Sequence, residues 1–182
     1  MTSQAPNPPF THRLATVADS DRLALLMDAA IGELQRGFLS PEQIAASRTI
    51  MGIDRQLITD GTYFVVESGA EIAGCGGWSR RATLYGGDHS PGRDAALLDP
   101  AADAARVRAM YTSPAFARRG VGQLVLSLCE AAARRDGFRR VELAGTMSGQ
   151  PLYERCGYTV IEAMLDDRGG APVPLVRMGK AL

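Results

Sequence analysis

The sequence contains little cysteine and histidine and has no excess charge of either sign. Three of its 182 residues are cysteine and two are histidine, and the cysteines are too far apart to form a CxxC pair. This pattern argues against a disulfide framework and a metal site, and it favours the reduced thiols of a cytoplasmic protein. Twenty basic residues balance twenty acidic ones. We therefore expect no nucleic-acid partner, because there is no broad basic field to bind phosphate backbones.

Long apolar runs are also missing. No stretch approaches the roughly 20 apolar residues of a membrane span, and the opening residues MTSQAPNPPF lack the apolar core of a signal peptide. We expect a cytoplasmic protein with no membrane contact, in which residues 1–10 form a disordered arm. The hydrophobic content of 46% is ordinary for a globular protein. Residues 11–182 show neither a repeat nor a linker and should form a single domain.

Strand and helix patterns alternate along this domain. Apolar residues recur at helical spacing after Asp19 and predict a first helix. Ser40 and Gln43 form a capping box around Pro41, which predicts a second helix that ends near Ile53. The other expected elements are a short turn at 57–58, strands at 12–16, 62–67, 72–84, 105–112, 140–145, 158–165 and 173–182, and helices at 120–136 and 150–157.

The segment FARRGVGQLVLSLCEAAARRDGF, residues 116–138, begins with an unusual helix start. Arg118, Arg119, Gly120 and Gly122 stand where a helix usually has a Ser, Thr, Asp or Asn cap. Free N–H groups at a helix start attract anions, glycines let the backbone approach them, and arginines add donors suited to phosphate. The lysine of a P-loop and the third glycine of a dinucleotide fingerprint are both absent. A glycine turn with solvated arginines is the alternative interpretation.

The order of these elements resembles the GNAT family of acetyl-CoA-dependent N-acetyltransferases. ARRGVG resembles the pyrophosphate loop of that family, and PLYERCGY resembles its frequent Phe-Tyr-Glu-Lys-x-Gly-Phe segment. The resemblance extends from about Tyr63 to the end of the chain. It implies an α/β fold with a mixed, mostly antiparallel sheet of six or seven strands, splayed at its middle and flanked by about four helices. It also implies an enzyme that moves an acetyl group directly from acetyl-CoA to an amine.

The resemblance assigns roles to individual positions. Met110, Tyr111 and Thr112 match the strand whose backbone pairs with the pantetheine of coenzyme A. The turn that holds the pyrophosphate is matched by Arg118, Arg119, Gly120, Val121, Gly122 and Gln123. Thr146 stands where the family often has an asparagine and is counted with the cofactor-binding positions. Tyr153 matches the tyrosine that protonates the departing thiolate, a role that suits a phenol with a reference pKa of about 10.

A general base is missing from the position where some family members have one. That position holds Arg106, and an arginine cannot accept a proton at neutral pH. His89, beside Asp88, and Glu33 are candidate bases, although a solvated surface position is the alternative for each. A chain of water molecules could also carry the proton.

The acceptor stays open at this point: it is an amine-bearing small molecule or peptide. The acyl group that is preferred and a homodimeric state also stay open. A coenzyme A-binding sensor or interaction module without turnover is the alternative function, because a fold does not settle an activity. Residues 85–103, rich in Gly, Asp, Pro and Ala, are expected to form a mobile lid over the acceptor and to set its specificity.

Overall fold

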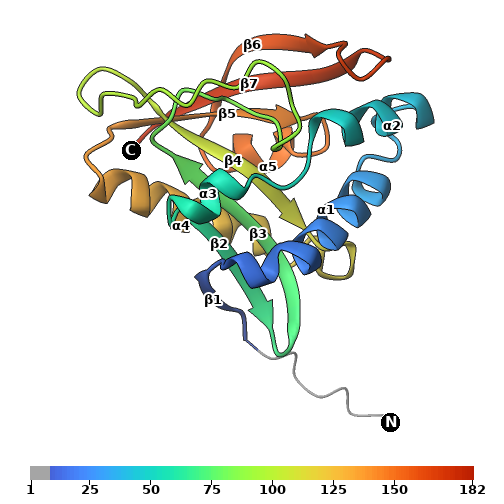
Figure 1. The fold of residues 1–182 in the computed structure, drawn as a ribbon, viewed down its shortest axis with the longest axis horizontal. Helices are drawn as coiled ribbons and strands as arrows, with labels where there is room; N and C mark the ends of the chain where they lie inside the picture. Colours follow the sequence, from blue (N-terminus) through green and yellow to red (C-terminus); the bar gives the residue numbers. More distant parts are fainter. Residues whose placement is uncertain (1–8) are drawn as a thin grey trace.

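The computed structural model describes residues 9–182 and contains a seven-stranded sheet flanked by helices (Figure 1). Its strands are β1 (Thr11–Leu14), β2 (Tyr63–Ser68), β3 (Glu71–Ser79), β4 (Ala105–Thr112), β5 (Arg140–Thr146), β6 (Thr159–Asp166) and β7 (Val173–Ala181). Its helices are α1 (Ser20–Leu34), α2 (Pro41–Ile50), α3 (Arg55–Thr59), α4 (Val121–Arg135) and α5 (Gln150–Arg155), with 3₁₀ turns at Val17–Asp19 and Pro114–Phe116. The expected α/β class and the mixed sheet are confirmed, with five helices in the described residues instead of about four.

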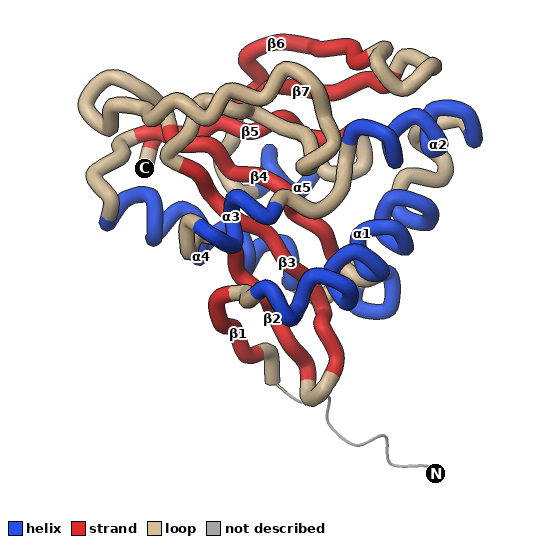
Figure 2. Tube along the Cα trace, viewed as in Figure 1, coloured by secondary structure: helices blue, strands red, loops and turns tan. Residues whose placement is uncertain are grey.

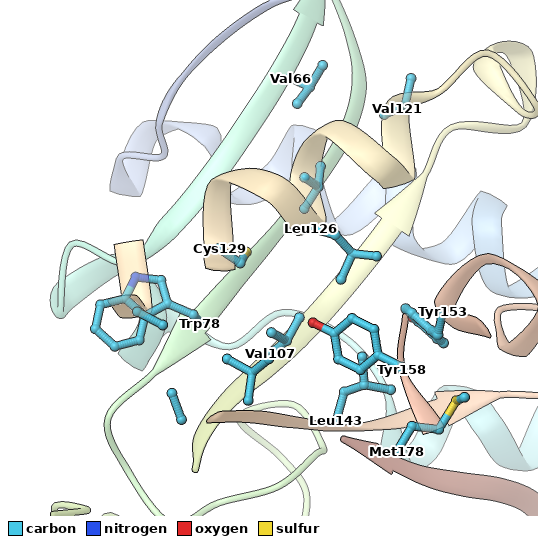
Figure 3. Packing of buried hydrophobic residues seen from close by; sticks show 14 of the residues in the cluster. Val66, Trp78, Val107, Val121, Leu126, Cys129, Leu143, Tyr153, Tyr158 and Met178 are labelled. Atoms are coloured by element: carbon cyan, nitrogen blue, oxygen red, sulfur yellow. The ribbon is translucent and has the colours of Figure 1, made fainter. Parts of the chain in front are cut away.

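The helices cover both faces of the sheet (Figure 2). On one face, α4 and α5 pack on the larger core, in which Leu126 and Cys129 of α4 lie near Val107 of β4 (Figure 3). On the other face, α1 and α3 pack on a second core that includes Tyr63 and Cys75. Both sheet faces are therefore apolar, and only an interruption of the sheet itself can open a deep site between its strands.

That interruption lies between β4 and β5 in the strand order β1-β2-β3-β4-β5-β7-β6. These two strands run parallel, whereas the other neighbouring strands are antiparallel. They pair only at Ala105 with Val141 and at Arg106 with Glu142. Beyond these pairs the strands separate, as Figure 1 shows towards the right of the sheet. The splay expected at the middle of the sheet is present.

A β-bulge in β4 lies beside the opening. Ala109 and Met110 of β4 stand opposite the single residue Gly76 of β3, because the register shifts between Cys75 and Gly77. Ala109 has a φ of 50°, which is rare for a residue with a side chain. The Tyr63 hydroxyl, buried in the core, donates a 2.7 Å hydrogen bond to the Ala109 carbonyl. The bulge releases backbone groups from the ladder where β4 borders the opening.

The α2 capping box is present, but the helix ends earlier than the sequence predicts. Ser40 accepts a hydrogen bond from the Gln43 amide, and the Gln43 side chain accepts one from the Ser40 amide. The helix ends at Ile50 and not near Ile53, because Met51 is extended and the Gly52 amide donates to the Tyr111 hydroxyl. The expected turn at 57–58 is the helix α3, which is capped by the carboxylate of Asp54.

The long connection from β3 to β4, residues 80–104, is fastened to the rest of the fold. The Ser90 hydroxyl donates to the Ile50 carbonyl, and Arg168 donates to the Pro91 carbonyl. Tyr85 donates to the buried carboxylate of Asp166 at 2.8 Å. The sequence predicts a mobile lid at residues 85–103. These hydrogen bonds tie the segment to α2 and to the end of β6, and its mobility stays a prediction.

The expected disordered arm at residues 1–10 lies largely outside the described residues. Phe10 is described, and its ring packs edge-on against Phe116 at a centroid distance of 6.3 Å. The packed part of the chain therefore includes residue 10, one residue before the boundary that the sequence suggests.

Replacement of Tyr63 by Phe should destabilise the protein, because it leaves the Ala109 carbonyl of the bulge without its hydroxyl donor. We expect a loss of about 1–3 kcal/mol in the free energy of unfolding, measured by urea titration. Ser127→Ala is a matched control, since it removes a hydroxyl hydrogen bond from the exposed side of α4. A Tyr63→Phe protein as stable as the wild type would show that this hydroxyl does not hold the bulge.

Stability should fall in acid because of Asp166. Hydrogen bonds from Arg168, with smaller contributions from Tyr85, lower the pKa of this buried carboxyl to about 2. The unfolded chain takes up a proton first, near pH 4, so the stabilisation is complete above that pH and is lost as the pH falls towards 2. Between pH 6 and pH 3, the wild type should lose about 1 kcal/mol more than Asp166→Asn in urea titrations.

Asp167→Asn is the control for this experiment, because Asp167 is the exposed neighbour and makes no side-chain ion pair among the described residues. Its pH dependence should follow that of the wild type. Equal pH dependence in the wild type and Asp166→Asn would contradict the role given to Asp166.

Candidate active site

The opening between β4 and β5 leads into a cavity of about 810 Å³. Its walls come from the end of β4, the turn before α4, the first residues of α4, α5 and the C-terminal half of α1. Two arginines line it, and the described residues that line it include no aspartate, glutamate, histidine or lysine. The cavity is therefore suited to an elongated ligand that is anionic at one end and apolar along its length.

The anionic end is at the start of α4. Gly120 is the N-cap, with a φ of 85° that favours glycine, and no side chain caps the helix. The first turn of α4 contains no acidic residue. The amides of Val121, Gly122 and Gln123 therefore have no partner within the helix and lie at the edge of the cavity. Together with the helix dipole, these free amides are suited to bind an anion, as the sequence also suggests.

The two arginines of the loop have different positions. Arg118 is exposed, lines the cavity and has a φ of 63°. The loop therefore has two residues, 118 and 120, with a left-handed backbone conformation. The Arg119 guanidinium lies over the rings of Phe116, at 4.9 Å, and Phe10, at 5.5 Å, and does not line the cavity. Sequence reasoning placed both side chains on the anion. In the structure only Arg118 faces the cavity, because aromatic rings hold Arg119 elsewhere.

The opposite wall of the cavity is α5, in which the sequence points mainly to Tyr153. Leu152 of α5 approaches Gly122 so closely that a Cβ at residue 122 would lie 2.7 Å from the Leu152 side chain. The glycine therefore keeps the two walls close together, in addition to any role in binding. Arg155 lines the same wall, and its side chain makes no ion pair among the described residues. Arg118 and Arg155 thus supply positive charge from two sides.

Met110, Tyr111 and Thr112 line the middle of the cavity at the free edge of β4. This part of the strand has no partner in β5, since the pairing ends at Arg106. A ligand with amide groups can hydrogen-bond to such an unpaired strand edge as an added strand does. Thr146, at the end of β5, lines the facing side and accepts a hydrogen bond from the Gly149 amide at 3.2 Å.

Tyr153 lies on α5, where the cavity becomes narrow. Its side chain is about nine-tenths buried, and its ring packs edge-on against Tyr158 at 6.0 Å (Figure 3). Burial raises the pKa of the phenol to about 12, which keeps it protonated at neutral pH. A Cβ at Gly145 or Gly149 would come within 2.9 Å of the ring, so both glycines are needed to seat it. The motif around Tyr153 does not by itself reveal the role of these two glycines.

A smaller inner pocket of about 90 Å³ begins at Tyr153. It shares Met110, Tyr111 and Tyr153 with the main cavity, but none of the anion-binding residues of the α4 turn. Tyr85 and Gly86 of the 80–104 segment form part of its wall. This segment therefore forms part of the wall of the inner pocket, and its role in acceptor specificity stays a prediction.

The residues considered as a general base do not reach either cavity. Glu33 and His89 are exposed and line neither of them, and Asp88 is paired with Arg55 at 2.8 Å. Arg106 forms an ion pair with Glu142 at 2.7 Å. Among the described residues, no carboxylate or imidazole lines the cavities.

Residues 9–182 contain neither a cluster of metal-ligating side chains nor a membrane-spanning helix. No group of three or more His, Cys, Asp or Glu side chains in this range is arranged to hold a metal ion. No helix in it combines the length and the apolar character that crossing a membrane requires.

Comparison with known proteins places this geometry in a family. The chain matches the acetyltransferase (GNAT) family over residues 27–158, which is more than half of its length. Comparison with curated protein sequences gave no match. Among solved structures, the fold is similar to that of a GCN5-related N-acetyltransferase from Rhodopseudomonas palustris, with a TM-score of 0.71 and 16% identity over 99% of this chain and 100% of that one.

Two other similar structures were solved with ligands. The PaiA N-acetyltransferase of Thermoplasma acidophilum, in complex with coenzyme A, has a TM-score of 0.64 and 13% identity over 96% of this chain and 99% of its own. YncA of Salmonella typhimurium, with its cofactor acetyl-CoA, has a TM-score of 0.62 and 20% identity over 95% of this chain and 94% of its own. At these identities the structures support the fold, and the match over residues 27–158 supplies the classification: the chain belongs to the GNAT family of acetyltransferases.

Proposed function

We propose that this protein is an N-acetyltransferase that moves an acetyl group directly from acetyl-CoA to the amine of a small molecule or peptide. The observation that carries the proposal is a single cavity with free helix amides at one end and a buried, protonated phenol at the other. Acetyl-CoA, which has a diphosphate in its nucleotide part and a thioester at its other end, matches this arrangement. The two ligand-bound relatives, with coenzyme A and acetyl-CoA, support the choice of cosubstrate.

The lining residues fit acetyl-CoA in charge and in shape. The amides of residues 121–123 and the Arg118 guanidinium would hold the diphosphate, and Arg155 would add a further contact to phosphate. The free edge of β4 at residues 110–112 would hydrogen-bond to the pantetheine amides, and Leu152 would cover its apolar parts. The sulfur would then lie near Tyr153. When bound, acetyl-CoA supplies an acyl group activated as a thioester.

The transfer replaces a carbon–sulfur bond with a carbon–nitrogen bond and requires two proton transfers. The neutral amine nitrogen forms a bond to the thioester carbonyl carbon, and the carbon–sulfur bond breaks. The backbone amides released by the bulge at Met110 are suited to stabilise the charge that develops on the carbonyl oxygen. Tyr153 donates its proton to the leaving sulfur, and the attacking nitrogen loses a proton to water, since no carboxylate or imidazole lines the site. The products are an amide and free coenzyme A.

A coenzyme A sensor without turnover is the second candidate, and the absence of a lining carboxylate or histidine favours it. Incubation with acetyl-CoA and a panel of amines separates the two candidates. Release of free thiol that depends on the amine supports the enzyme, whereas tight binding of coenzyme A without thiol release supports the sensor.

Of the two arginine side chains in the loop, Arg118 should contribute to the binding of coenzyme A and Arg119 should not. We expect Arg118→Gln to weaken binding by about 5–30-fold in Kd, equivalent to the loss of about 1–2 kcal/mol from one charged hydrogen bond. Arg119→Gln is the matched control, since Arg119 lies on Phe10 and Phe116, and its Kd should change little. Calorimetric titration measures both values. A larger effect of Arg119→Gln would reverse the assignment of the two side chains.

Replacement of Tyr153 by Phe should slow the chemical step and leave binding intact. Only the hydroxyl is lost, so the ring still fills the space beside Gly145 and Gly149. We expect kcat to fall by roughly 10²–10⁴-fold, while the Kd for coenzyme A and the melting temperature stay near those of the wild type. Tyr158→Phe, which removes a hydroxyl bonded to Glu130 on the same core, is the control. An unchanged single-turnover rate in Tyr153→Phe would assign the proton donor elsewhere.

A further inference from the structure

The wall of the inner pocket contains a buried arginine on β4. Arg108 is 4% exposed and lines the inner pocket together with Tyr85, Gly86 and Tyr111. The pocket shares Met110, Tyr111, Thr146 and Tyr153 with the main cavity, but none of the residues of the α4 turn that would hold the diphosphate. In the proposed reaction, a group bound beyond these shared residues is assigned to the acceptor.

Arg108 belongs to a buried cluster with an excess of positive charge. Asp54, which is 1% exposed, forms ion pairs with Arg108 at 2.6 Å and with Arg93 at 2.9 Å. Two guanidinium groups therefore share one carboxylate. Burial lowers the pKa of Arg108, because desolvation opposes its charge and Asp54 compensates for it only in part. An additional anion in the pocket would balance the cluster.

The hydrogen bonds of Arg108 are also incomplete. Its Nη2 donates to the Gly86 carbonyl at 2.7 Å, but its buried Nε has no acceptor among the described residues. Asp54 Oδ2 lies close to Nη1 but accepts no aligned hydrogen bond. A buried charged donor without an acceptor is costly and calls for an explanation.

Arg108 is not the sole fastening of this region. Arg93 already binds Asp54 and donates to the carbonyls of Gly86 and Gly87, and the Ser90 hydroxyl donates to the Ile50 carbonyl. These bonds fasten the 80–104 segment to the turn between α2 and α3. Arg108 is the member of the cluster that lines the inner pocket, whereas the Arg93 side chain does not.

The other lining residues exclude a strongly cationic acceptor. Neither cavity is lined by an aspartate or glutamate among residues 9–182, so the charged amines of a polyamine would find no carboxylate. The remaining polar side chains of the inner pocket include the hydroxyls of Tyr85, Tyr111 and Thr146. A volume of about 90 Å³ has room for a group of a few heavy atoms, such as a carboxylate.

We propose that the acceptor is a small amine that also carries a carboxylate, and that Arg108 binds this carboxylate in the inner pocket. The inference rests on the proposed acetyl transfer and names the substrate class of that reaction. The Nε of Arg108, which has no acceptor among the described residues, can donate a charge-assisted hydrogen bond to one oxygen of this carboxylate. Arg108 thereby positions the amine of the acceptor near Tyr153 and selects acceptors by their negative charge.

The first test compares acceptors in the wild-type protein, so it does not depend on the folding of a variant. Thiol release from acetyl-CoA is measured with amino acids whose amine lies one, two or three carbons from the carboxylate, and with the amide and the decarboxylated amine of each. Rates are compared per unprotonated amine. We expect kcat/KM to be about 10–100-fold higher for at least one acid than for its amide and amine, as loss of a charged hydrogen bond predicts. Equal or higher values of kcat/KM for the compounds without a carboxylate would overturn the proposal and leave the acetyltransferase function intact.

If no compound releases thiol, calorimetric titration of the same compounds into the protein saturated with coenzyme A decides the question. Binding of an acid in preference to its amide supports the carboxylate site, even in a sensor without turnover. Equal binding, or no binding of any acid, overturns it. Failure of coenzyme A itself to bind would instead contradict the proposed function.

The second test assigns the selectivity to one side chain. Arg108→Gln should reduce the ratio of acid to amide in kcat/KM to near one, chiefly through KM, and Arg108→Lys should restore part of it. Arg93→Gln is the matched control, because it removes a positive charge from the same carboxylate outside the pocket, and it should keep the ratio. Circular dichroism and coenzyme A affinity report whether each variant folds. A folded Arg108→Gln protein with an unchanged ratio would contradict the assignment.

Discussion

The separation of β4 from β5 is the constraint on which the rest of the site depends. A parallel pair that ends after two residue pairs leaves a row of backbone groups without partners in the middle of a sheet that is covered on both faces. Such groups are costly to bury unless a ligand or water satisfies them. The same separation brings the start of α4, the free edge of β4 and α5 around one cavity. A break in the ladder thus supplies both the space and the hydrogen-bonding groups of the site.

Close packing around this cavity determines where its polar groups point. Leu152 and Gly122 hold α4 and α5 in contact, and Gly145 and Gly149 make room for the ring of Tyr153. Because the ring is fixed by packing, its hydroxyl needs no charged partner for orientation and remains in an environment that disfavours phenolate. The bulge at Ala109 is held by the Tyr63 hydroxyl from the opposite face of the sheet. Tyr63, which supports the bulge, lines neither cavity, whereas Gly149, which helps to seat Tyr153, lines the large one.

The sequence predicts most of the elements and the glycine turn before α4, because these depend on local patterns. The capping box at Ser40 and Gln43 and the glycine at Gly120 act within a few residues of chain. The early end of α2 could not be predicted, since it depends on a contact between Gly52 and Tyr111. For the same reason the orientation of Arg119, which depends on Phe10, and the pairing of Arg108 with Asp54 became visible only in the structure. Contacts between distant residues decide these features.

The fastening of the 80–104 segment has a consequence for how the two halves of the site assemble during folding. Much of the large cavity is built from one continuous stretch, residues 110–156, which runs from the end of β4 through α4 and β5 to α5. The wall of the inner pocket instead depends on contacts such as Ser90 with Ile50 and Tyr85 with Asp166, which join residues 40 and 81 positions apart. Contacts over such long loops carry a high closure entropy and form slowly. The wall of the inner pocket should therefore be completed late in folding and open first in local unfolding, while the large cavity stays assembled.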